Sequence, residues 1–266
     1  MNDMDTLEAT LSTKEYALVQ VEGGGAHMAG QIPWDREFIR ALPTVVEKHG
    51  TLLCIDEVVT GFRESRGGWQ ELVGVKPDLS TLGKCVGGGL AVGIVIGKAD
   101  IFETLQPGGV RGRRMSHSGT WNANPLTASA GVAACETYLD GEPQKKAAEM
   151  GAYLRDAGNE ILQKKGISGF LYGRTVIHVY FGPMEFQPDN EYSPPTADPK
   201  TIMGDESIVS AKTLLGLHLL QRGIATMGGR YFIMSAAHSQ ADVDRTMEQF
   251  AGSIDDMAGE GLLPRK

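Results

Sequence analysis

The sequence predicts an α/β fold in two parts: a large domain with a parallel-type sheet over residues 1–140 and a smaller α+β domain over residues 141–266. In the first part, short apolar runs alternate with a helical pattern, which is typical of strands joined by helices in a parallel sheet. The pattern changes after Gly141, Glu142 and Pro143. A long amphipathic stretch there leads into β-like and helical segments without that alternation.

The first part contains four expected strands and two expected helices. The strands cover residues 17–22, 52–55, 78–82 and 90–96, and the second of them runs on into Asp56 and Glu57. A helix over 35–49 has apolar residues at helical spacing and ends at Gly50. A second helix covers 126–139. It follows Asn124-Pro125, and its alanines and Gly131 indicate close packing against a neighbour.

The second part mixes helices and short strands. Helices are expected over 144–165, over 206–222 and from about residue 241. The 170–181 segment is β-like, and short strands are expected at 224–227 and 231–235. A Pro-rich stretch over 182–199 has no expected regular structure.

Composition excludes several classes of function. A formal charge of −8 on 266 residues argues against nucleic acid or an anionic membrane as a partner. No apolar run is long enough to span a membrane, and the N-terminal residues lack the features of a signal peptide. The three cysteines have no CxxC spacing, so neither a disulfide framework nor a metal site is expected. We therefore expect a reducing, cytoplasmic setting.

Lys84 is the only charged residue of the apolar segment LSTLGKCVGGGLAVGIVIG, which covers residues 79–97. Most lysines extend into water from an exposed turn. In these apolar surroundings we expect a buried amine with a lowered pKa, which can attack an aldehyde and form a Schiff base. The three glycines that follow would let a planar cofactor approach the main chain.

Two further positions suit the same kind of cofactor. Asp56 ends an apolar strand, where its carboxylate could pair with a protonated pyridine nitrogen or act only as a turn or cap residue. Lys84 ends the next strand, so both should lie at one edge of the sheet. Thr120, in HSGTWNANP, offers a hydroxyl and an N–H for a phosphate, although such residues before a helix usually form caps. No GxGxxG or GxxxxGK[ST] motif occurs, which disfavours dinucleotide and P-loop sites.

Three motifs, in this order, resemble class III aminotransferases of fold type I: IDEVVTGFR (55–63), GVKPDLSTLGKCVGGGLAVG (74–93) and HSGTWNANPLTASAG (117–131). The most similar branch is that of glutamate-1-semialdehyde aminomutase and β-amino-acid aminotransferase. Residues 214–250 resemble the C-terminal domain of the same branch. The resemblance implies that residues 1–140 are the C-terminal half of the large domain, which binds pyridoxal 5'-phosphate (PLP).

The resemblance also implies site residues. Lys84 matches the Schiff-base lysine, and Asp56 matches the partner of the pyridine nitrogen. Val58 matches the aliphatic residue packed on one face of the ring. Thr120 matches the threonine that contacts the cofactor phosphate from the neighbouring subunit of a dimer. His27 falls where relatives place a residue near the ring.

The implied activity is PLP-dependent transfer of an amino group on a small amino-acid-like substrate, by an aminotransferase or an aminomutase. The alternative is a non-catalytic or half-enzyme subunit, because the resemblance begins almost at Met1 and covers only the C-terminal part of the family. A second polypeptide carrying the N-terminal half, a longer parent protein and a self-associating half all remain open. The expected partner is a second copy or a complementary chain.

Overall fold

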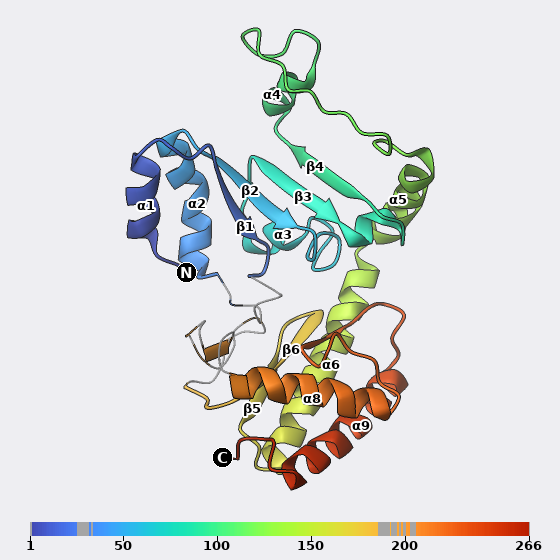
Figure 1. Cartoon of the computed structure of the whole chain (residues 1–266). Coiled ribbons are helices and arrows are strands. Elements are labelled where there is room, and N and C mark those ends of the chain that lie inside the picture. The colour runs from blue at the N-terminus through green and yellow to red at the C-terminus, as the bar shows by residue number, and fades with distance from the viewer. Residues whose placement is uncertain are drawn as a thin grey trace. The chain divides into compact units, whose positions relative to one another are not determined.

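The computed structural model of the chain describes residues 2–25, 32, 34–185, 192, 196, 198, 201–202 and 206–265, without the side chains of 206–210 (Figure 1). Contacts divide the chain into two compact units. The first unit comprises Met1–Gly23 and Trp34–Gly141, and the second comprises Gly24–Pro33 and Glu142–Lys266. Each unit has its own sheet, and each is described by itself.

The first unit is built on a four-stranded sheet in the order β1-β2-β3-β4. Its strands are β1 (Leu18–Glu22), β2 (Leu52–Glu57), β3 (Leu79–Gly83) and β4 (Gly93–Gly97). The first three strands run parallel, as the sequence predicts, whereas β4 runs antiparallel to β3. Only nine residues, 84–92, join β3 to β4, and a parallel crossover needs a dozen or more residues. The β4 edge strand is almost entirely exposed despite its apolar sequence.

The helices of the first unit are α1 (Met4–Ser12), α2 (Arg36–His49), α3 (Trp69–Val73), α4 (Ala99–Phe102) and α5 (Pro125–Tyr138), with short 3₁₀ turns η2 (Lys84–Gly87) and η3 (Glu103–Leu105). The sequence predicts α2 and α5 to within two residues but not the short helices α1, α3 and α4. The Asp35 carboxylate caps α2 by accepting from two main-chain N–H groups at 2.9 Å. Buried Ile39 and Leu42 are on the face of α2 that packs against β2.

Helix α5 lies very close to the η2 turn. A Cβ built on Gly131 would lie 2.7 Å from the carbonyl oxygen of Val86, and one built on Gly88 would lie 2.5 Å from that of Ala130. The close packing predicted from the small residues of this helix is therefore confirmed. Helix α5 nevertheless buries no residue, and Leu126 and Val132 are 70% and 60% exposed.

The second unit contains an antiparallel sheet in the order β5-β6-β7. Its elements are α6 (Glu142–Lys164), β5 (Gly169–Tyr172), β6 (Val176–Phe181), α8 (Glu206–Gln221), β7 (Tyr231–Ile233) and α9 (Gln240–Gly259). Every residue of β6 is buried. Leu154 of α6, Leu215 of α8 and Phe250 of α9 belong to one hydrophobic core with residues of the sheet.

The strand predicted at 224–227 is wrong, because these residues form no ladder. The N–H of Ile224 donates to Leu219 at the end of α8, and that of Gly228 donates to Thr226. These local bonds occupy main-chain groups that a strand would have used. No helix among the described residues is long and apolar enough to cross a membrane.

Candidate functional site

Asp56, Val58 and Lys84 lie at the carboxyl ends of two neighbouring parallel strands. In the register of β2 and β3, Asp56 is beside Thr81 and the following pair is Glu57 with Leu82. The next residues are therefore brought together: a Cβ built on Gly83 would lie 3.3 Å from a methyl group of Val58. Lys84 follows Gly83 directly. The chain ends of parallel strands meet at one edge of the sheet, where ligands of α/β proteins bind.

Lys84 begins the η2 turn with φ of 50°, in the left-handed region that non-glycine residues seldom adopt. Backbone conformations of this kind are concentrated at functional sites. The expectation of a buried Lys84 is wrong for this chain, because its side chain is exposed. The residue leaves the end of β3 at the first position of a turn, so its apolar neighbours in the sequence do not enclose it.

The half-buried carboxylate of Asp56 uses one oxygen in a local hydrogen bond and keeps the other for a further donor. Its Oδ1 accepts from the main-chain N–H of Val58 at 2.9 Å, which is the turn role considered from the sequence. Within the described part of the chain, no hydrogen bond to Oδ2 is formed. The second oxygen is thus available for a protonated ring nitrogen, and the residues at this edge fit a pyridine-containing cofactor.

The turn that carries Lys84 is held by contacts that the sequence did not predict. The Arg63 guanidinium donates to Sγ of Cys85 at 3.4 Å. The Tyr138 hydroxyl, from the end of α5, donates to the carbonyl oxygen of Cys85 at 3.4 Å. Burial raises the pKa of Tyr138, which keeps this hydroxyl a donor. The residue after Lys84 is therefore fixed from two sides.

Glu57 is another residue that the sequence reasoning missed. Its side chain is fully buried, directly after Asp56. Burial raises the pKa of its carboxyl above the usual range, although hydrogen bonds from Thr60, Gln70 and Trp69 limit the rise. A second carboxylate at the end of an apolar strand was the available signal.

Thr120 lies in an exposed turn before α5. No hydrogen bond or ion pair between described residues connects it to Asp56 or Lys84. The helix cap is Asn124, whose side chain accepts from Leu126 N–H at 2.9 Å. Residues of this segment and of 91–94 line an open cavity of about 670 Å³, with Trp121 at its surface. His27 falls outside the described residues.

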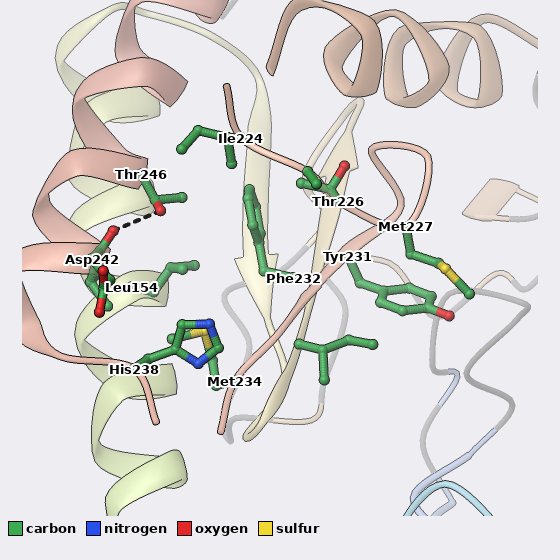
Figure 2. Close-up of a pocket in the computed structure, with 13 residues that line it drawn as sticks. Leu154, Ile224, Thr226, Met227, Tyr231, Phe232, Met234, His238, Asp242 and Thr246 are labelled. Carbon is green, nitrogen blue, oxygen red and sulfur yellow. Dashed lines mark hydrogen bonds between the residues drawn. The ribbon is translucent and has the colours of Figure 1, made fainter. Parts of the chain in front are cut away.

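The second unit has a smaller pocket of about 280 Å³ beside β7 and the start of α9 (Figure 2). Its lining is largely apolar, with Thr226 and Tyr231 as polar members on the β7 side and His238, Asp242 and Thr246 as polar members near α9. The last three already bond to the main chain near the start of α9. Nδ1 of His238 accepts from Ser235 N–H, Asp242 accepts from Ser239 N–H, and the Thr246 hydroxyl donates to the Asp242 carbonyl. These bonds account for the three polar groups near α9.

No group of three or more potential metal ligands occurs among the described residues. The strand edge with Asp56, Val58 and Lys84 is the candidate site, because the ends of two parallel strands bring a carboxylate, an aliphatic side chain and an amine to one place.

Comparison with known proteins identifies the family of the chain. A family model described as aminotransferase class-III matches residues 4–177. Glutamate-1-semialdehyde 2,1-aminomutase of Hyperthermus butylicus is 34% identical over 255 residues, covering 93% of this chain and 55% of that protein. The chain spans about half the length of the curated relatives it matches.

Two solved structures of transaminases share the fold of this chain. An omega-transaminase from Sphaerobacter thermophilus matches with a TM-score of 0.85 and 28% identity, over 97% of this chain and 57% of that one. A β-phenylalanine aminotransferase from Variovorax paradoxus matches with a TM-score of 0.80 and 27% identity, over 99% and 58%. The chain therefore belongs to the class III aminotransferase family and has part of the fold-type-I architecture.

Proposed function

We propose that this chain binds PLP and takes part in the transfer of an amino group on a small amino-acid-like substrate, as an aminotransferase or an aminomutase. The observation that carries the proposal is the meeting of Asp56, Val58 and Lys84 at one strand edge. Membership of the class III family supports the cofactor, and the names of the relatives support the substrate class.

Each residue has a defined task in this proposal. Lys84 Nζ would hold the cofactor covalently and would also take a proton from the substrate carbon and return it. Asp56 Oδ2 would keep a ring nitrogen protonated, while Oδ1 stays bonded to Val58 N–H. Val58 would supply aliphatic contact to the ring. PLP, when bound, supplies the electron sink for the reaction.

Two assignments extend the site beyond this strand edge. Thr120 contacts the cofactor phosphate bound by a neighbouring subunit of a dimer, a role that its exposed turn permits. His27, which falls outside the described residues, is a further proposed cofactor-binding residue. We place the protein in the cytoplasm, where its three free cysteines stay reduced.

A second candidate function is that of a half-enzyme, active only with a complementary chain or a second copy. One observation bears on it: α5 presents apolar side chains to solvent without burying any. A self-associating or complemented assembly would cover that face.

The decisive experiment is borohydride reduction of the PLP-loaded protein followed by peptide mapping. We expect the label on Lys84, and none in Lys84→Ala. The exposed lysines nearest in sequence, Lys76 and Lys98, are the internal controls. A label on either of them instead, or PLP uptake unaffected by Lys84→Ala, would refute the assignment.

Subunit mixing tests Thr120. If it acts in a neighbour's site, inactive Lys84→Ala and Thr120→Ala subunits should recover part of the activity when they exchange. Exchange without recovery would assign Thr120 to its own subunit's site or to no site. The same mixture, followed by sedimentation, separates a dimer from a chain that needs a different partner.

A further inference from the structure

Glu57 is a completely buried carboxylate at the end of β2. Successive residues of a strand point to opposite faces, so its side chain lies on the face away from that of Asp56. Oε1 accepts from Gln70 N–H at 2.7 Å. Oε2 accepts from Trp69 N–H at 3.0 Å and from the Thr60 hydroxyl. One carboxylate therefore joins residues nine positions apart, from Thr60 to Trp69.

These bonds replace a helix cap. The first N–H groups of a helix have no partner within it and usually bond to the residue before it. For α3 that residue is Gly68, which has no side chain to offer. A Cβ built on Gly68 would lie 2.6 Å from Glu57 Oε2, and its φ is 78°. Glycine thus lets the distant carboxylate act as the cap.

The loop of residues 58–68, closed at both ends by Glu57, contains two contacts to the Lys84 turn. Val58 packs against Gly83, and Arg63 bonds to Sγ of Cys85. These contacts flank Lys84 in the sequence. A buried carboxylate is unfavourable unless fully hydrogen-bonded, and here three donors compensate it.

We infer that Glu57 is a positioning residue for Lys84: its carboxylate holds the 58–68 loop against the Lys84 turn without touching the reacting groups. The inference rests on the proposed function and deepens it. Glu57 fixes Val58, which we propose contacts the cofactor ring, and it fixes Arg63, which bonds to the Lys84 turn. The site therefore depends on side chains on both faces of β2.

Three variants separate this role from a general loss of stability. Glu57→Ala removes all three acceptors, whereas Glu57→Gln keeps a carbonyl oxygen for one N–H and an amide that can donate to Thr60. Glu71→Ala is the matched control, since it removes an exposed carboxylate that accepts from Gly67 N–H at 2.9 Å in the same loop. Urea unfolding of each variant establishes that it is folded.

The first measurement needs no cofactor: the alkylation rate of Cys85 relative to Cys135. Local opening of the loop should release Arg63 from Cys85, so we expect Glu57→Ala to react about tenfold faster at Cys85. Glu57→Gln and Glu71→Ala should stay within about twofold of the parent. If Glu57→Ala does not fold, Thr60→Val, which removes one of the three donors, replaces it and should also speed the reaction.

The second measurement uses the PLP-loaded assembly. We expect Glu57→Ala to lose most of the visible circular dichroism of the bound cofactor and about 100-fold in turnover, as small misplacements can cause. Glu57→Gln should restore both. An unchanged Cys85 rate together with an unchanged cofactor spectrum in a variant that lacks the carboxylate would overturn the inference. Failure of the parent chain to bind PLP would instead refute the proposed function. The alkylation rate of Cys85 would still show whether Glu57 holds the 58–68 loop against the Lys84 turn.

Discussion

The two units differ in how they use their apolar residues. In the second, every residue of β6 is buried and α9 places six side chains in the interior. In the first, β4 is almost wholly exposed and α5 buries nothing, although its sequence is apolar. The second unit thus completes its own hydrophobic core, whereas the first leaves apolar surface uncovered and concentrates polar contacts around the strand ends. Substitutions in the first should change chemistry and association, and those in the second should change stability.

Asp56→Asn should have the largest effect of these variants, and the effect should be on turnover and not on stability. The amide cannot keep a ring nitrogen protonated, so we expect turnover of the active assembly to fall by roughly 100- to 1000-fold. Its Oδ1 can still accept from Val58 N–H, so the folding free energy should change by less than about 1 kcal/mol. Steady-state kinetics and urea unfolding measure the two effects. Wild-type turnover would reduce Asp56 to a turn residue.

Phe250→Ala, in the second unit, should instead lower the folding stability. The ring is fully buried and packs edge-on against Phe232 at 6.4 Å between centroids, so its loss should destabilise the unit by about 3–5 kcal/mol. Leu126→Ala, at an α5 position that is 70% exposed, is the control and should stay within about 0.5 kcal/mol. Equal losses in the two variants would show that α5 is buried in solution, by an oligomer or another partner.

Lys212 makes the second unit sensitive to alkaline pH. Burial, together with the charge of Arg230, lowers its pKa to about 8. An unfolded lysine titrates near 10.4, so the unfolded state binds more protons between these values and stability rises with pH across that window. Lys212→Met should therefore stabilise the protein at pH 7 by about 3 kcal/mol, with the gain vanishing by about pH 10.5. Lys164→Met, at an exposed lysine of the same unit, is the control in the same urea titrations.

Helix caps test whether the units unfold separately. Asp35→Ala uncaps α2, and Ser239→Ala breaks the capping box of α9, each at about 1 kcal/mol. All three tryptophans (Trp34, Trp69, Trp121) belong to the first unit, so fluorescence follows that unit and far-UV circular dichroism follows both. We expect only Asp35→Ala to shift the fluorescence transition. A shift in both variants would mean that the units unfold together.

The sequence predicts most of the elements because their signals are local. Apolar spacing and the Asp35 and Gly50 boundaries define α2, and the strand rhythm places Asp56 and Lys84 at one edge. The exposure of Lys84 was not predictable, because it depends on a turn whose φ of 50° is not evident from an apolar composition.

Two other features were not predictable from the sequence. The contact between Glu57 and the start of α3 joins residues 12 and 13 positions apart, beyond the range of any local pattern. The prediction of a strand at 224–227 was wrong because Ile224 N–H donates to Leu219 at the end of α8 and the Thr226 carbonyl accepts from Gly228 N–H, so both groups are used locally.

The left-handed backbone of Lys84 lowers the stability of the fold at the residue that we propose holds the cofactor. A lysine there is less stable than a glycine by about 1 kcal/mol, since only glycine adopts this region without a steric penalty. Lys84→Gly should therefore abolish covalent capture of the cofactor and yet raise the melting temperature. Selection for stability alone would favour glycine at this position, in a run that already continues with three glycines. Under the proposed function, the lysine at this position gives up that stability in exchange for a covalent bond to the cofactor.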